Sequence, residues 1–158
     1  MDGMPKTSAG ILLYRKTERG IEFLLAHPGG PLFAKKDDGF WSIPKGELKD
    51  DEDMLAAAKR EFKEETGILP EGTYRELGTV TQLNGKIVHA WAVESNCDPA
   101  TLHSNLFSME WPPHSGKRQE FPEMDRFGFF TLEEASRKIY VSQLIFLERL
   151  LNAIDGNR

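Results

Sequence analysis

Three glutamates within one short segment, residues 46–68, constrain this chain more than any other feature. The segment is GELKDDEDMLAAAKREFKEETGI. Because a helix turns 100° per residue, Glu61, Glu64 and Glu65 fall within an arc of roughly 100° on one helix side. Like charges four residues apart, as at Glu61 and Glu65, destabilise a helix on their own. Such an acid cluster predicts a compensating cation, and carboxylate oxygens suit Mg²⁺ or Mn²⁺.

The neighbouring residues predict where this helix begins, ends and packs. Asp50 and Asp51 are candidate caps at its start. Glu52 and Asp53 are expected in its first turn, where acids interact favourably with the helix dipole. Gly67 provides a stop for the helix. Three apolar residues form a core-facing stripe at helical spacing beside the acids: Leu55, Ala58 and Phe62.

The segment resembles the Nudix box, which is a glycine, five residues, a glutamate, seven residues, and then Arg-Glu-apolar-any-Glu-Glu-any-Gly-apolar. Every fixed position is matched, and seven identities at about 5–7% each arise by chance at roughly one in 10⁹ starting positions. Phe62 stands where an aliphatic residue is more usual, a departure that affects packing only. The matching residues are Gly46, Glu52, Arg60, Glu61, Glu64, Glu65 and Gly67.

The resemblance implies a hydrolase that cleaves a nucleoside diphosphate linked to another group, with divalent cations bridging the phosphate oxygens. It implies Glu61, Glu64 and Glu65 as ligands of Mg²⁺ (or Mn²⁺), and it places Glu64 and Arg60 in the catalytic set. Arg60 resembles the family's supporting arginine and is expected to orient either Glu52 or Glu64. Alternatively, Glu52 serves only as a charge at the helix N-terminus.

Many members of the family take a further glutamate from a loop outside the box, as general base or extra ligand. Glu120 and Glu123, in the stretch GKRQEFPEMD, are the two candidates. Glu123 is slightly favoured because it precedes an aromatic strand at a spacing similar to that in several members. Either residue is alternatively a solvated loop acid, since position in a loop is weak support for a role.

The residues just before the box bear on the substrate. Pro44, Lys45 and Gly46 resemble the Pro-Lys-Gly variant that recurs among Nudix hydrolases of dinucleoside and diphosphoinositol polyphosphates. Lys45 and Gly46 are therefore the expected substrate-binding residues, with Lys45 reaching a phosphate as a point charge. The tyrosine that some dinucleoside polyphosphate hydrolases carry beyond the box is missing, which withholds support. Flanking basic residues that are candidates to hold a long polyphosphate are Lys35, Lys36, Lys117 and Arg118.

The expected function is Mg²⁺-dependent pyrophosphohydrolysis, with a dinucleoside polyphosphate such as diadenosine tetraphosphate as the leading substrate class. A nucleoside triphosphate pyrophosphohydrolase that cleans the nucleotide pool is the alternative with the same chemistry. RNA cap removal is less attractive for a short chain without a basic tract. From a different class, a non-catalytic Nudix-fold sensor would bind a nucleotide and regulate a partner, although such proteins commonly have a degraded box.

Composition limits the remaining classes. A chain of 158 residues is long enough for one domain with a sizeable core, and a single domain is expected over residues 1–158. A net charge of −5 argues against a general nucleic-acid or membrane partner, which leaves a small nucleotide bound by a monomer or homodimer. Cys97 is the only cysteine, and residues 1–10 lack the features of a leader. These observations predict a cytoplasmic protein.

The order of predicted elements indicates an α/β protein and resembles the Nudix α/β/α sandwich with a mixed β-sheet. Asn84-Gly85 predicts a hairpin turn, and Thr131 to Glu134 predicts a capping box that starts a helix. Residues 112–122 are expected to form a proline-rich, basic loop. Strands are expected over residues 7–14, 21–26, 73–83, 86–94, 106–111 and 126–130, and a last helix over 142–154.

Overall fold

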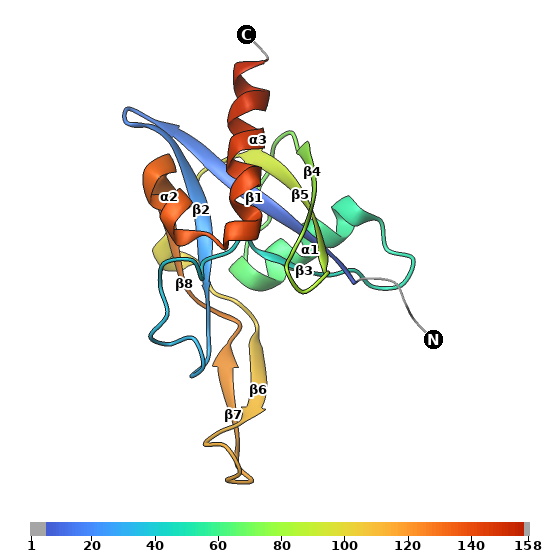
Figure 1. Ribbon diagram of the computed structural model, residues 1–158, viewed down its shortest axis with the longest axis vertical. Coiled ribbons are helices and arrows are strands. Elements are labelled where there is room, and N and C mark those ends of the chain that lie inside the picture. The colour runs from blue at the N-terminus through green and yellow to red at the C-terminus, as the bar shows by residue number, and fades with distance from the viewer. Residues whose placement is uncertain (1–5, 157–158) are drawn as a thin grey trace.

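A mixed β-sheet forms the centre of the protein (Figure 1). The computed structural model describes residues 6–156. The strand order is β4-β5-β1-β2-β8, with β3 also paired to β1. β1 runs parallel to β5 and antiparallel to β2, as the expected mixed sheet requires. The strands are β1 (Thr7–Thr17), β2 (Gly20–Pro28), β3 (Lys45–Glu47), β4 (Arg75–Thr81), β5 (Ile87–Glu94) and β8 (Met124–Thr131).

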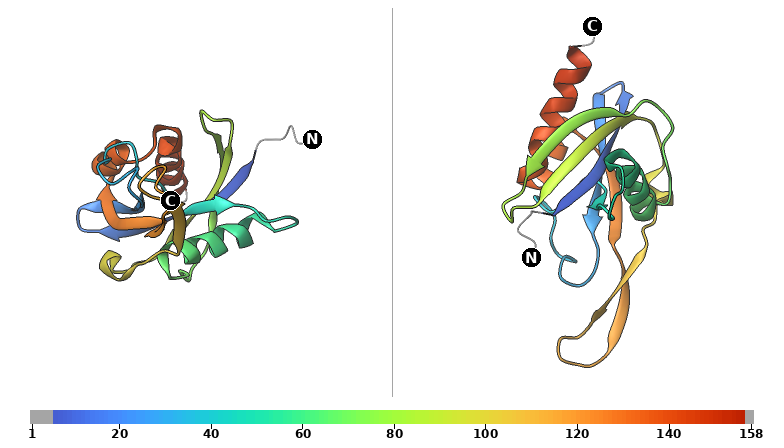
Figure 2. Two further views of the ribbon diagram at one scale, coloured as in Figure 1. Left: turned by 90° about the horizontal axis from the view of Figure 1, so that it is seen from below. Right: turned by 90° about the vertical axis from the view of Figure 1, so that its right-hand side faces the viewer.

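Helices cover both faces of this sheet because the central strands are apolar on both sides. In β1, Ile11 and Leu13 pack in one core with Phe62 of α1 (Met54–Thr66). Leu12 lies in the opposite core with Phe146, as the alternation of side chains along a strand requires. Figure 2 shows α1 on one side of the sheet and the remaining helices on the other. The predicted α/β/α sandwich is therefore confirmed, and its second layer consists of α2 (Leu132–Lys138) and α3 (Leu144–Asp155).

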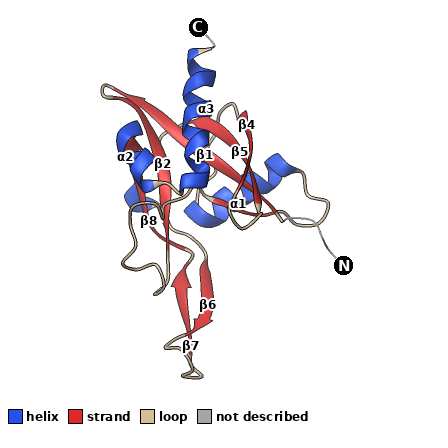
Figure 3. Ribbon diagram, in the orientation of Figure 1, coloured by secondary structure: helices blue, strands red, loops and turns tan. Residues whose placement is uncertain are grey.

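The expectation that residues 112–122 form only a loop is wrong. Residues Arg118–Pro122 form β7, which pairs antiparallel with β6 (Leu106–Glu110) in a separate two-stranded sheet. This hairpin extends away from the body of the molecule (Figure 3). Phe107 lies opposite Phe121, and their rings are 6.0 Å apart. A strand with so few apolar residues gives little alternation, so the pairing is not visible in the sequence. Short turns η1 (Pro99–Thr101) and η2 (Val141–Gln143) complete the described elements.

The start of α1 also differs from the expectation. The N-cap is Asp53, whose side chain accepts a hydrogen bond from the Ala56 N–H, whereas Asp50 and Asp51 precede the helix. The reason is a turn before the helix, in which the Glu52 N–H bonds the Lys49 carbonyl and the Glu52 side chain faces away from the helix end. The expectation that Glu52 and Asp53 lie in the first turn is also wrong, because the helix begins at Met54. Gly67 ends the helix as predicted with φ 85°, and Ala58 and Phe62 are buried while Leu55 is partly buried.

Two further observations concern expectations about location. Within residues 6–156, no helix is both long and apolar enough to cross a lipid bilayer. The expectation about a leader concerns residues 1–10, of which residues 1–5 lie outside the described part of the chain. The capping box at the start of α2 is present as predicted, since the Thr131 and Glu134 side chains each bond the other's backbone N–H.

Candidate active site

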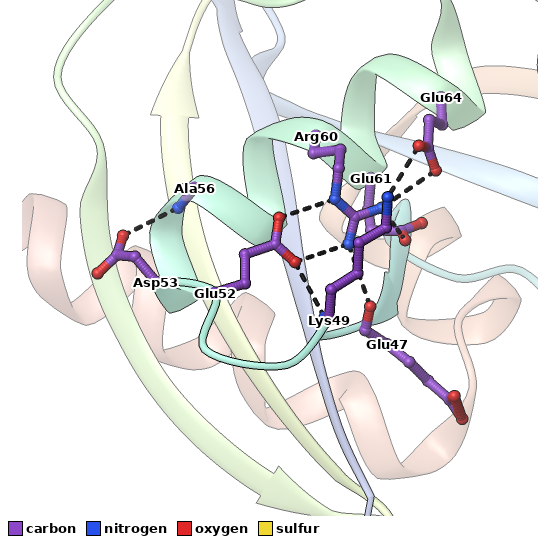
Figure 4. A network of polar contacts seen from close by, with 8 residues as sticks. All are labelled: Glu47, Lys49, Glu52, Asp53, Ala56, Arg60, Glu61 and Glu64. Carbon is purple, nitrogen blue, oxygen red and sulfur yellow. Dashed lines mark hydrogen bonds and ion pairs between the residues drawn. The ribbon is translucent and has the colours of Figure 1, made fainter.

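Arg60 organises the carboxylates of α1 (Figure 4). Its Nε and Nη2 donate to the two oxygens of Glu52 at 2.8 and 2.9 Å. Its Nη1 donates to Glu61 Oε1 at 2.7 Å and, more weakly, to Glu64 at 3.3 Å. Nη2 also reaches the Glu47 carbonyl at 3.2 Å. Arg60 therefore contacts both expected partners, with the stronger two-point contact to Glu52.

Glu52 has a structural role that its position before the helix does not suggest. The Arg60 guanidinium lowers the pKa of its carboxyl to about 2, and the Lys49 N–H contributes to the same shift. The Arg60 pKa is raised in turn, first by its bond to Glu52. The pair links the turn before α1 to the middle of the helix. Glu52 is thus an ion-pair partner of Arg60 and not only a charge at the helix end.

Gly46 and Glu61 fit against each other at the junction of β3 and α1. A Cβ atom at residue 46 would collide with the Glu61 carboxylate, so a larger residue here would displace the Glu61 side chain. The Glu61 side chain is 13% exposed. Burial raises the pKa of Glu61, while its bond to Arg60 acts in the opposite direction. The absence of a side chain at Gly46 therefore leaves space for the Glu61 carboxylate.

Glu65 is the most deeply buried acid of the site. Its residue is 5% exposed, and its Oε1 accepts a hydrogen bond of 3.1 Å from the Lys45 backbone N–H. Burial raises the pKa of Glu65 to about 8, and the nearby charges of Glu61 and Glu123 add to that shift. Glu65 thus ties β3 to α1 while lying close to two other carboxylates.

The structure separates the two candidate loop glutamates. The Glu123 N–H donates to the Asn105 carbonyl, and the Asn105 N–H donates to the Glu64 carbonyl, both at 2.9 Å. Glu123 is half-buried; burial raises its pKa first, followed by the charges of Glu61 and Glu64. Glu120 is exposed on β7, opposite Ser108 in the hairpin. Glu123 therefore lies with the helix acids, and Glu120 does not.

A hollow of about 490 Å³, called the Lys45 hollow below, is linked to this cluster through Lys45, whose N–H bonds Glu65. Its lining includes Lys45 and Gly46, the polar residues of the β4–β5 turn, and Tyr140. Burial lowers the pKa of Lys45. Lys86, which the sequence analysis did not select, also lines the hollow. The sequence signal for Lys86 is its position directly after the Asn84-Gly85 turn, because a hairpin places its two strand ends side by side.

The four flanking basic residues do not line this hollow. Lys35 and Lys36 lie between β2 and β3, where the Lys36 ammonium lies 5.6 Å from the centre of the Phe40 ring. Lys117 and Arg118 belong to the hairpin, and Arg118 donates to Ser108 at 3.1 Å. Of the five basic residues expected from the sequence to bind phosphate, Lys45 alone lines the Lys45 hollow.

The carboxylates suit a divalent cation in chemistry but are not gathered into a ready cage. Among residues 6–156, no group of three or more His, Cys, Asp or Glu side chains is arranged to hold a metal ion. Arg60 Nη1 engages Glu61 and Glu64, while Glu65 bonds the Lys45 N–H. The donors are nevertheless hard oxygen ligands of the kind Mg²⁺ prefers. Glu61 and Glu65 have raised pKa values, and a cation bound between them would relieve the repulsion of their charges.

Comparison with known proteins finds an enzyme with a related sequence segment and a solved structure with a similar fold. A Caenorhabditis elegans bis(5′-nucleosyl)-tetraphosphatase (asymmetrical) is 41% identical over 64 residues, a match that spans 40% of this chain and 42% of that enzyme. The structure of a C. elegans Ap4A hydrolase binary complex is similar with a TM-score of 0.68 and 26% identity, covering 94% of this chain and 98% of that one.

A more distant structure supports the fold alone. The NUDIX domain of Shewanella oneidensis NrtR complexed with ADP ribose matches with a TM-score of 0.69 and 13% identity, over 98% of this chain and 90% of that one. The NUDIX domain profile itself matches residues 4–150. These matches agree with the expectation of a hydrolase acting on phosphoanhydride bonds. The chain belongs to the NUDIX domain family.

Proposed function

We propose that this protein is a Mg²⁺-dependent pyrophosphohydrolase that cleaves a nucleoside diphosphate-linked substrate. One observation carries the proposal: Glu61, Glu64, Glu65 and Glu123 lie together, and Glu65 bonds the backbone of Lys45, which lines the Lys45 hollow together with Lys86. A pyrophosphate bridge is densely anionic, so its hydrolysis requires charge neutralisation and an activated water. In a site of clustered acids and lysines, a metal ion held by the acids and the lysine ammonium groups would neutralise the phosphate charge. One of the acids would act as the base that activates water.

The roles of the acids follow from their surroundings. Glu61, Glu64 and Glu65 would hold the Mg²⁺, which neutralises phosphate charge and lowers the pKa of bound water. Arg60 holds Glu61 and Glu64 in place by donating hydrogen bonds to both carboxylates. Glu123 accepts the proton of the attacking water, because a carboxylate whose pKa is raised toward neutrality is a stronger base than an ordinary one.

The substrate class that we propose is a dinucleoside polyphosphate such as diadenosine tetraphosphate. Lys45 and Lys86 supply positive charge for the phosphates, and Tyr140 supplies an aromatic surface in the same hollow. The segment match to the bis(5′-nucleosyl)-tetraphosphatase adds support from a relative. Together these features favour a substrate that carries a nucleoside and an extended phosphate chain.

Product analysis with Mg²⁺ tests the proposal. The panel is diadenosine tetraphosphate, ordinary and oxidised nucleoside triphosphates, ADP-ribose and a diphosphoinositol phosphate. Asymmetric cleavage of diadenosine tetraphosphate to a triphosphate and a monophosphate is the expected result. Release of pyrophosphate from a triphosphate instead would assign the protein to the nucleotide-pool class. Nucleotide binding without turnover of any compound would support a sensor.

A matched pair of lysine variants tests the Lys45 hollow. Lys45→Ala should raise KM for diadenosine tetraphosphate about tenfold, because a charge-assisted contact with a phosphate is lost. Lys35→Ala, on a loop outside the hollow, should leave KM unchanged. Equal KM values in the two variants would show that the phosphates bind elsewhere.

A further inference from the structure

A buried histidine lies close to Glu123 but outside the acid cluster. His27 is fully buried near the end of β2. Its Nε2 lies 2.6 Å from the Lys36 carbonyl oxygen, and its Nδ1 lies 2.7 Å from Asp125 Oδ1. A carbonyl only accepts, so Nε2 carries a proton, and one further proton lies between Nδ1 and Asp125. The imidazole is thus fully bonded and turned away from solvent, so a direct role in the chemistry is excluded.

The partner of His27 marks a β-bulge in β8. His27 lies opposite Arg126, but the next residue, Pro28, lies opposite Met124. Asp125 is therefore an extra residue on β8, as in a bulge where two residues face one. Without the bulge, the chain before Asp125 would slip by one residue, and a one-residue slip turns each side chain to the opposite face. The bulge consequently determines the side on which Glu123 lies.

Both backbone groups of Glu123 depend on this arrangement. The Gly29 N–H donates to the Glu123 carbonyl at 2.9 Å, and the Glu123 N–H donates to Asn105, which bonds Glu64 of α1. A Cβ atom at Gly29 would collide with the Pro122 carbonyl oxygen, so the two segments approach as closely as glycine permits. The bonds of Glu123 therefore form only in the register that the bulge sets.

We infer that His27 and Asp125 are positioning residues that fix the β8 bulge and thereby hold Glu123 on the side of the box acids. The inference rests on the proposed function, because it takes Glu123 as the general base. It adds two residues that contact neither the acid cluster nor the Lys45 hollow. Their effect on turnover passes through the backbone from Asp125 to Glu123.

Two substitutions of Asp125 separate this role from a loss of charge. In Asp125→Ala, Nδ1 of His27 loses its partner and the bulge its anchor, so kcat should fall about tenfold to a hundredfold with KM nearly unchanged. In Asp125→Asn, the amide N–H donates to a neutral Nδ1, so kcat should stay within about threefold of the wild type. Asp38→Ala, which removes an exposed acid paired with Lys138, is the control.

A double-variant series identifies the residue through which the pair acts. Glu123→Gln should lower kcat strongly, and adding Asp125→Ala to it should change kcat less than about twofold, since coupled residues are not additive. Equal loss from Asp125→Ala in both backgrounds, or equal kcat in Asp125→Ala and Asp125→Asn, overturns the inference but leaves the proposed function standing. Wild-type turnover in Glu123→Gln overturns the base assignment, and the inference with it.

Amide hydrogen exchange gives a readout that needs no turnover. The Gly29 N–H should exchange faster in Asp125→Ala than in the wild type and should stay protected in Asp125→Asn, because it bonds the Glu123 carbonyl. The same rate in all three proteins would overturn the positioning role, whatever the substrate. Thermal unfolding of each variant identifies any that fails to fold, and His27→Gln then serves as the second test of the same contact.

Discussion

Two groups of carboxylates in this molecule differ in how they are paired. Asp37 and Asp38, before β3, are paired with Lys138 at 2.8 and 3.2 Å, and Arg137 lies 3.4 Å from Asp38. The bond from Lys138 lowers the pKa of Asp37. On α1, by contrast, burial raises the pKa values of Glu61 and Glu65. The first group is neutralised by its neighbours, and the second is partly buried beside other acids.

The difference shows why local acid density does not identify a metal site. Asp37 and Asp38 are adjacent acids, yet they bond cations at the surface. In the box, Arg60 directs its two-point contact to Glu52, and Glu65 accepts from an uncharged backbone N–H. A cation is attracted to acids that are crowded, partly buried and incompletely paired. The following changes test this contrast, from the largest expected effect to the smallest.

Glu64→Gln should have the largest effect. It removes one charged donor from the proposed metal site, and kcat should fall about 10²- to 10³-fold, similar to the loss of a group that stabilises developing charge. The Glu64 side chain is 36% exposed, so the fold should remain intact. Asp38→Asn, at the neutralised group, should leave kcat unchanged. Steady-state assays with Mg²⁺ measure kcat for both variants. Equal kcat values would show that the metal binds elsewhere.

Arg60→Lys should have the next largest effect. Lysine keeps the charge but lacks the planar fork that contacts Glu52 and Glu61 together. The apparent affinity for Mg²⁺ or the turnover should fall about 10- to 100-fold, as for other groups that orient metal ligands. Arg137→Lys, beside Asp38, is the matched control. Mg²⁺ titration of turnover measures both, and a response to Mg²⁺ in Arg60→Lys that matches the wild type would contradict the supporting role.

Glu65 should make the stability of the metal-free protein depend on pH. The pKa of Glu65 is about 8 in the folded protein, whereas the ordinary value is 4.5. Between pH 4.5 and 8 the folded chain therefore keeps a proton on Glu65 that the unfolded chain has lost. The contribution of Glu65 to the free energy of unfolding is therefore largest below pH 4.5, and it is lost as the pH rises toward 8. Thermal unfolding in EDTA should show a midpoint that falls as the pH rises, by about 2–4 °C for each kcal/mol of stability lost. Equal pH slopes in wild type and Glu65→Gln would refute this.

Lys138→Met should have the smallest effect. It removes the cation of the neutralised group and should cost about 0.2–1 kcal/mol of unfolding free energy, the usual contribution of an exposed ion pair. Turnover should not change, because Asp37 and Asp38 have no part in the proposed chemistry. Urea denaturation and the standard activity assay measure the two quantities. A clear loss of kcat would show that the two groups of acids are coupled.

Features that depend on neighbouring residues were predictable from the sequence. The helix stop at Gly67, the hairpin turn at Asn84-Gly85 and the capping box at Thr131 each depend on a few adjacent residues, and all three are present. The box identities implied the family, which the NUDIX domain match confirms. The assigned roles of the site residues remain predictions that the variants above test.

Features that depend on strand register were not predictable. The contact of His27 with Asp125, 98 residues apart, follows from how distant segments meet. The pairing of β6 with β7 is local, but β7 has too few apolar residues to show an alternating pattern. The N-cap at Asp53 depends on a turn in which Glu52 is drawn to Arg60 eight residues later. In each case the feature depends on a specific contact between side chains or strands, which propensity and periodicity do not describe.

The pairing of β2 with β8 also determines when the site can form during synthesis. Leu24 lies opposite Phe129, so this pairing joins positions roughly a hundred residues apart and is slow compared with local structure. The contacts within α1 are local, whereas Glu123 reaches the box acids only after β8 has paired. We expect a ribosome-arrested chain that ends before β8 to show no turnover, and turnover there would contradict this. A growing chain should thus leave cellular nucleotides untouched until its last strand is in place.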